Sequence, residues 1–228
     1  NVPGVVRVEG WTAVNGTILN ADGTEGNSMT ILAPPGGSDL TRPKIVAGRW
    51  LEPDDTNAHP HTSNSGRLVL IHNGIIENYA IIKSALQRHG YTFKSETDTE
   101  VLVNLIEKIQ LQNSLPLEEA TRLALTQVHG AYAIVVMDRD DPNKLVAARR
   151  SSPLVIGVGK GEFLIGSDAT PIVEHTKNVV YLEDEQVATC ILGQELSIKT
   201  LRNEVAPHSV HEIELEIGQL EKGGYDHF

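Results

Sequence analysis

The sequence predicts a layered α+β fold. Three segments in the middle of the chain repeat apolar residues at the three-to-four-residue spacing of amphipathic helices. The segments that follow are short apolar runs separated by turn residues, which is typical of antiparallel strands. Helices that pack on such strands form a layered α+β architecture. With 228 residues and 40% hydrophobic content, the chain can form a real core in one large domain or two small ones.

The first 56 residues show no helical periodicity and are expected to be rich in β-structure. Turn dipeptides such as Asn15-Gly16 and Asp22-Gly23 interrupt short apolar runs. The run Pro34-Pro35-Gly36-Gly37 ends one of these runs. Strands are therefore predicted at residues 5–8, 17–19, 29–33 and 44–47.

Residues 67–71 are predicted to form a strand, and residues 77–89 a helix. The helix has one apolar face and Gly90 as its C-terminal stop. Glu77 and Asn78 are expected to cap its first turn.

Two further helices are predicted at residues 99–110 and 117–128. Either Ser95 or Thr97 can cap the first of them, because both are hydroxyl residues placed just before the apolar repeat.

The remainder of the chain is predicted to be mainly strands. Gly157, Gly159 and Gly161 match neither phosphate-loop template, so a hairpin turn is favoured there. A short helix is expected at residues 171–175. Strands are predicted at 131–138, 145–149, 154–158, 163–167, 179–183, 186–192 and 196–200.

Charge and cysteine content exclude several classes of protein. The formal charge of −11 argues against nucleic acid or an anionic membrane as the main partner. One cysteine excludes an intrachain disulfide and a cysteine-based zinc site. No apolar run is long enough to span a membrane, and no signal peptide is visible. A cytoplasmic protein is expected, and because the chain begins with Asn1 we expect a fragment or a processed form.

An apolar strand runs directly into His72-Asn73-Gly74. This sequence places a side-chain amide beside an unobstructed backbone N–H, a pair that can stabilise a developing oxyanion. The alternative is a simple turn, because Asn-Gly is a common turn dipeptide. Asp98, in the later run Ser95-Glu96-Thr97-Asp98, can serve as a ligand carboxylate or merely as an acidic residue in the first turn of a helix.

These residues resemble the glutaminase domain of class II glutamine amidotransferases of the glucosamine-6-phosphate synthase type. The resemblance begins at Asn57-Ala58-His59-Pro60-His61 and runs to Gly224-Tyr225-Asp226-His227-Phe228. Between them it includes Gly130–Ile134, Ala147–Gly157 and Ile165–Asp168. It implies an N-terminal-nucleophile fold over residues 57–228. This is a four-layer αββα sandwich, here incomplete at its N-terminus and preceded by the β-rich segment.

The resemblance also implies a function and roles for particular residues. Asn73 and Gly74 would form the oxyanion hole for the amide of L-glutamine, and Asp98 would hold its α-amino group. His59 is a further substrate-binding candidate, although a structural or solvent role is the favoured alternative for it and for His61 and His72. No metal or other cofactor is expected. The ammonia released would pass to a sugar-phosphate isomerase domain, absent from this chain, which converts fructose 6-phosphate to glucosamine 6-phosphate.

The departures from the family concern the nucleophile and the substrate carboxylate. The family uses an N-terminal cysteine, whereas this chain begins with Asn1 and its only cysteine is Cys190. Cys190 lies in an apolar, strand-like run, so we expect a buried, unreactive thiol. Arg49-Trp50 resembles a substrate-binding pair of the family but lies about three residues too close to the following motif. The chain is therefore expected to lack glutaminase activity.

Residues 1–56 resemble instead an extracytoplasmic segment of ABC-transporter permeases. The sequence thus predicts a segment of separate origin at 1–56, followed by an amidotransferase-like domain at 57–228. The rival functional hypothesis is a non-catalytic module in which such a permease-derived segment is fused to an inert amidotransferase domain.

Overall fold

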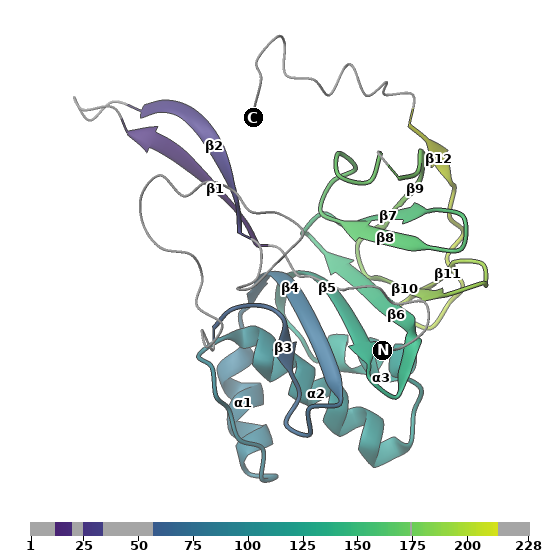
Figure 1. Ribbon diagram of the computed structural model, residues 1–228. Coiled ribbons are helices and arrows are strands. Elements are labelled where there is room, and N and C mark those ends of the chain that lie inside the picture. Colours follow the sequence, from purple (N-terminus) through teal and green to yellow (C-terminus); the bar gives the residue numbers. More distant parts are fainter. Residues whose placement is uncertain (1–11, 20–24, 34–56, 174, 214–228) are drawn as a thin grey trace.

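The computed structural model describes residues 12–19, 25–33, 57–173 and 175–213 (Figure 1). The strands predicted at 5–8 and 44–47, the Arg49-Trp50 pair and the motif at 224–228 lie outside these residues. The strands predicted at 17–19 and 29–33 fall within β1 (Thr12–Leu19) and β2 (Glu25–Ala33). These two pair with each other in antiparallel register, with Thr12 opposite Ala33.

Two antiparallel sheets form the centre of the structure. The larger has the strand order β11-β10-β6-β5-β4-β3 and the smaller the order β12-β9-β7-β8. The strands of the larger sheet are β3 (His61–Thr62), β4 (Leu68–Ile76), β5 (Gly130–Asp138), β6 (Asp141–Arg150), β10 (Gln186–Ile191) and β11 (Ser197–Thr200). Those of the smaller are β7 (Val155–Val158), β8 (Phe163–Gly166), β9 (Asn178–Tyr181) and β12 (His211–Glu212).

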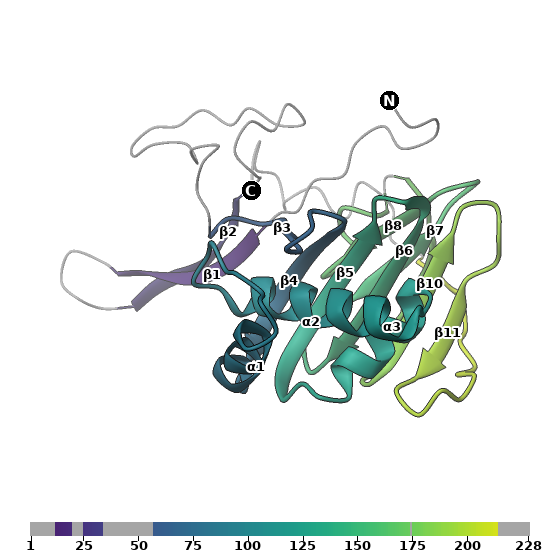
Figure 2. The same cartoon turned by 90° about the horizontal axis from the view of Figure 1, so that it is seen from below.

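Three helices, α1 (Tyr79–Gln87), α2 (Asp98–Asn113) and α3 (Leu117–Leu125), cover one face of the larger sheet (Figure 2). Buried residues of α2, such as Leu102 and Ile106, pack there against Leu70 and Ile134 of the sheet. None of the described helices is both long enough and apolar enough to cross a membrane, and the longest, α2, has 16 residues.

A second core fills the space between the two sheets. Ala147 and Ala188 of the larger sheet meet Ile156 and Val180 of the smaller one. This alternation of side chains between two buried faces is the pattern of a central sheet covered on both sides. The predicted α+β fold is confirmed: a helical layer and two stacked sheets follow one another.

Three predictions about local structure were wrong: the start of the first helix, its cap by Asn78, and the short helix near residue 171. The first helix begins at Tyr79, and the Asn78 side chain does not cap it. Asn78 instead accepts a hydrogen bond from the His129 N–H and donates one to the Gln127 carbonyl, at 2.9 and 2.8 Å. Within the short helix expected at residues 171–175, residues 171–173 and 175 instead form hydrogen-bonded turns. The β7–β8 turn is the expected hairpin, since the Gly159 N–H donates to the Glu162 carbonyl.

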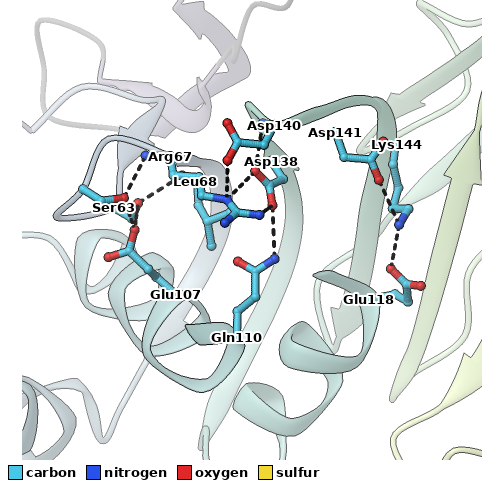
Figure 3. Close-up of polar contacts among 11 residues, drawn as sticks. Ser63, Arg67, Leu68, Glu107, Gln110, Glu118, Asp138, Asp140, Asp141 and Lys144 are labelled. Carbon is cyan, nitrogen blue, oxygen red and sulfur yellow. Dashed lines mark hydrogen bonds and ion pairs between the residues drawn. The ribbon is translucent and has the colours of Figure 1, made fainter. Parts of the chain in front are cut away.

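A polar cluster holds the start of β4 against β5 and α2 (Figure 3). The guanidinium of Arg67 donates two hydrogen bonds to the carboxylate of Asp138, at 2.8 and 2.7 Å. Gln110 of α2 donates a third to the same carboxylate, and Ser63 donates to the buried Glu107. Charge-assisted bonds of this kind are directional, so they fix the position of β4 along α2.

Candidate active site at the end of strand β4

Asn73 and Gly74 lie inside a strand, not in a turn. The predicted strand ended at Ile71, but β4 continues to Ile76 and pairs residue by residue with β5. Asn73 is opposite Ala133 and Gly74 is opposite Tyr132. The interpretation of Asn-Gly as a strand-ending turn is therefore wrong, and the dipeptide is held in a sheet.

The backbone of Gly74 has a conformation that only glycine adopts readily. Its φ is +131°, and a Cβ placed there would lie 2.2 Å from the carbonyl oxygen of Ala131. Side chains are excluded from this position by both conformation and contact. The glycine lets the two strands approach closely where Asn73 is exposed.

The hydrogen-bond pattern of β4 gives the direction of the Gly74 N–H. The Glu77 N–H donates to the His129 carbonyl, and the Arg139 N–H donates to the Arg67 carbonyl, so odd-numbered residues of β4 bond to β5. In an antiparallel pair these bonds alternate along the strand. The N–H of Gly74 is therefore directed to the opposite edge of β4, where the Ile76 N–H donates to Asp98.

Asp98 is the first residue of α2, and its carboxylate contacts the end of β4. Its Oδ2 accepts a hydrogen bond from the Ile76 N–H at 2.7 Å, and its Oδ1 lies 3.7 Å from Nδ1 of His72. Burial raises the pKa of Asp98, but the His72 ring and the Ile76 N–H outweigh this effect and hold the pKa below its usual value. The side chain, which is 21% exposed, thus presents a charged carboxylate at the edge of the sheet.

The start of α2 is fixed by hydrogen bonds of Thr97 and Glu100. Of the two predicted capping residues, Thr97 occupies the N-cap and accepts a hydrogen bond from the Glu100 N–H. Glu100 in turn accepts from the N–H groups of Lys94 and Ser95 and from the Ser95 hydroxyl. The Thr97 N–H donates to the Ser95 hydroxyl, and these bonds together place Asp98 at a defined point beside β4.

Three histidines surround the hydroxyl groups on either side of Asp98. Nε2 of His59 lies 3.2 Å and Nδ1 of His72 lies 3.1 Å from Oγ1 of Thr99. His61 contacts Thr97 through Nε2 at 3.2 Å. His59 is thus connected to Asp98 through the neighbouring threonine. The sequence predicted a helix cap at Ser95 or Thr97, but it gave no sign that Thr99 would join two histidines.

Burial favours the neutral forms of His59 and His61. Burial, together with the proximity of His61 and His72, lowers the pKa of His59 to about 4. Burial also lowers the pKa of His61. The described residues include no group of three or more histidine, cysteine, aspartate or glutamate side chains arranged to hold a metal ion. In the structure these rings serve as hydrogen-bonding partners of threonines.

Cys190 lies far from this edge, in β10, and its side chain is part of the core between the two sheets. The residue is 2% exposed, and burial raises the pKa of its thiol to about 12. The expectation of a buried thiol is confirmed.

The edge therefore combines four of the predicted residues in one region. Gly74 and Asp98 are linked through Ile76, and His59 is linked to Asp98 through Thr99. Asn73 is adjacent in sequence, but its side chain alternates to the face opposite that of the buried His72. Such a site can hold a cationic group at Asp98 and a polar oxygen at the Gly74 N–H.

Comparison with other proteins relates this chain to a known family. A family profile described as a glutamine amidotransferase domain matches residues 50–174. Glutamine–fructose-6-phosphate aminotransferase (isomerizing) of Bacteroides thetaiotaomicron is 55% identical over 187 residues, which are 81% of this chain and 30% of that protein. The enzyme of the same name from Chlorobaculum tepidum is 45% identical over 226 residues, 96% of this chain and 37% of that protein. The chain spans about a third of the length of these curated relatives.

Among solved structures, the fold resembles the glutamine phosphoribosylpyrophosphate amidotransferase of B. subtilis, solved with ADP and GMP. The TM-score is 0.53 at 24% identity, over 69% of this chain and 34% of that one. An allosteric regulatory enzyme of purine biosynthesis gives the same TM-score at 25% identity, over 64% of this chain and 31% of that one.

The permease resemblance of residues 1–56 finds no support in these comparisons. The alignment with the Chlorobaculum enzyme takes in most of that segment, because it covers 96% of the chain. The family match itself begins at residue 50, and a boundary at residue 57 stays a prediction. With that match across more than half of its length, and with the fold of its structural relatives, the chain belongs to the glutamine amidotransferase domain family.

Proposed function

We propose that the edge of β4 is the L-glutamine site of a glutaminase domain. Asp98 would bind the α-ammonium group, and the Asn73 amide and the Gly74 N–H would receive the side-chain carbonyl oxygen. The observation that supports this most directly is the 2.7 Å bond from the Ile76 N–H to Asp98. It fixes an anionic group two residues along the strand from Gly74, at the same edge.

We further propose that this domain supplies ammonia for the synthesis of glucosamine 6-phosphate from fructose 6-phosphate. The support comes from the two aminotransferases that are 55% and 45% identical to this chain. The acceptor reaction would belong to a sugar-phosphate isomerase domain, since the chain spans about a third of those proteins.

A preparation of these 228 residues alone is expected not to turn over glutamine. Its single cysteine, Cys190, is buried between the sheets with a raised pKa, whereas a reactive thiol must be accessible as a thiolate. Loss of the nucleophile of a covalent mechanism removes several orders of magnitude of rate. Such a preparation is a binding module with an amidotransferase fold.

The site is tested by titrating L-glutamine into the protein while its NMR spectrum is followed. We expect weak binding, with a Kd of roughly millimolar. In the family an arginine binds the ligand carboxylate, and Arg49 does not lie at the spacing that this contact requires. Asp98→Asn should weaken it at least tenfold, whereas Asp168→Asn, which changes an exposed turn residue, should leave it unaltered. An affinity for L-glutamine that is unchanged by Asp98→Asn would refute the proposed site.

Turnover is measured on the same preparation as glutamate released from glutamine. We expect none above the uncatalysed rate. Steady glutamate release that survives Cys190→Ala would contradict a cysteine-dependent reaction altogether. Release that this change abolishes would assign the nucleophile to Cys190.

A further inference from the structure

The hydroxyl group of Thr99 has three polar neighbours, each from a different part of the structure. Nε2 of His59, from the segment before β3, lies at 3.2 Å, and Nδ1 of His72, from β4, lies at 3.1 Å. Oδ1 of Asp98, the preceding residue of α2, lies at 3.5 Å. Thr99 itself is 2% exposed, so these contacts form away from bulk water.

The chemistry of the four groups allows one arrangement that satisfies all three contacts. A hydroxyl has one proton to donate and two lone pairs that accept. The carboxylate of Asp98 only accepts, so the Thr99 proton must be directed to it. Both imidazoles must then donate, His59 through Nε2–H and His72 through Nδ1–H.

The unpaired nitrogen of His72 supports this assignment. Its side chain is 1% exposed, and its Nε2 is buried with no hydrogen-bond partner among the described residues. In the arrangement above this atom carries only a lone pair. With a proton on Nε2, either in the other tautomer or in the cation, a buried donor would be left unsatisfied, which is costly, above all for a charged ring. The low pKa of His59, about 4, is consistent with a neutral ring there as well.

We propose that Thr99 and His72 are positioning residues that orient the carboxylate of Asp98 for an amino-acid ammonium group. The Ile76 N–H holds Oδ2, while the Thr99 hydroxyl, itself oriented by the His72 Nδ1–H, donates to Oδ1. With both oxygens restrained, the carboxylate plane is set before the ligand arrives, and less ordering is left for binding to impose. This inference rests on the proposed function, because it assigns to Asp98 the ligand ammonium.

The test compares variants that differ only in one buried hydroxyl. Thr99→Val removes the hydroxyl at almost constant shape, and Thr99→Ser restores it. Thr121→Val is the matched control, because Thr121 is also helical and fully buried but its hydroxyl has no partner in the described part of the chain. A purely structural role for the Thr99 hydroxyl would change stability and leave the carboxylate of Asp98 unaffected.

Two measurements apply to each variant, both by NMR. The first is the pKa of Asp98 from the ¹³C shift of its carboxyl group, which needs no ligand. The second is the affinity for L-glutamine. Thr99→Val should raise that pKa and weaken glutamine binding about tenfold, while Thr99→Ser and Thr121→Val should resemble the wild type. An unchanged pKa and affinity in Thr99→Val would overturn the proposal.

The ring nitrogens give an independent readout. At neutral pH the ¹⁵N shifts should show His72 protonated at Nδ1 alone and His59 at Nε2 alone. His72 found as the Nε2–H tautomer or as the cation would overturn the assignment. If Asp98→Asn weakens glutamine binding but Thr99→Val does not, the positioning role alone fails. If the affinity for glutamine is unchanged by Asp98→Asn, the proposed function is refuted, and the positioning role is refuted with it.

Discussion

At two residues of the candidate site, Gly74 and Asp98, a single atom or contact determines the local geometry. At Gly74 the absence of a Cβ permits a φ of +131° against the Ala131 carbonyl. At Asp98 one backbone N–H, that of Ile76, turns the carboxylate toward the strand. The neighbouring His59 adds a titratable ring whose pKa is shifted by its surroundings.

Gly74→Ala should be severely destabilising. The new Cβ would lie 2.2 Å from a backbone oxygen, and the residue would be forced into a region that alanine avoids. We expect a loss of at least about 3 kcal/mol in the free energy of unfolding. Gly66→Ala is the control, since Gly66 also has a positive φ, +74°, but no atom of the residues that the structure describes lies within 4 Å of its Cβ position. It should lose only about 1 kcal/mol, and urea titration of both variants gives the comparison.

The stability of the domain should fall as the pH drops from about 6.5 toward 4. The pKa of His59 is about 4 in the folded state against a model value of 6.5 for the free side chain, so the unfolded chain takes up the proton first. Stability is therefore complete above this window and is lost as the pH falls through it.

The contribution of His59 is expected to be about 1 kcal/mol between pH 7 and 5, with allowance for its partial exposure. His59→Gln should make the fall shallower, and the same change at the exposed His175 should not. The check is urea unfolding at several pH values. Equal slopes for wild type and His59→Gln would contradict the assigned shift.

At the scale of elements, β4 is held at both ends by polar groups that come from elsewhere in the chain. At its start, Arg67 pairs with Asp138 at the end of β5. At its end, the Ile76 N–H is bound by α2, and Asn78 beyond it is bound by residues 127 and 129. These contacts fix the register of the strand that carries Asn73 and Gly74.

Arg67→Met should lower the free energy of unfolding by about 2–3 kcal/mol. The change leaves the Asp138 carboxylate, which is 3% exposed, without its cation. Adding Asp138→Asn removes the unpaired charge while keeping an oxygen that can accept from Gln110. The double variant should therefore be more stable than Arg67→Met alone in chemical denaturation. A double variant of lower stability would show that charge burial is not the dominant effect.

At the scale of the whole molecule, the larger sheet separates two cores. One lies under α1, α2 and α3, and the other lies between the sheets, where Cys190 is buried. Close packing on both faces leaves the interior thiol inaccessible without extensive opening. The reactivity of Cys190 thus reports on the integrity of the stacked sheets.

Native protein should react with a thiol reagent only at the rate at which it unfolds. Burial raises the Cys190 pKa to about 12, so both access and thiolate formation are suppressed. A cysteine introduced at the exposed Ser209 in a Cys190→Ala background should react at the rate of a free thiol. Mass spectrometry during a urea series follows both. Fast labelling of Cys190 without denaturant would be incompatible with this core.

The sequence by itself determined the α+β class, the central helices, most strands of the two sheets and the burial of Cys190. These features are local, because periodicity and turn residues act over a few neighbouring positions. It also carried the motifs that indicated the family, which the comparisons then established over residues 50–174.

Only the tertiary structure decided how the site is built. Pairing with β5 extends β4 past Asn73 to Ile76, although Asn-Gly favours a turn. Asn78 leaves its helix uncapped because partners at 127 and 129 compete for its side chain. The Ile76–Asp98 and His59–Thr99 contacts join residues 22 and 40 positions apart. Such contacts depend on the packing of whole elements, and no local preference in the chain encodes them.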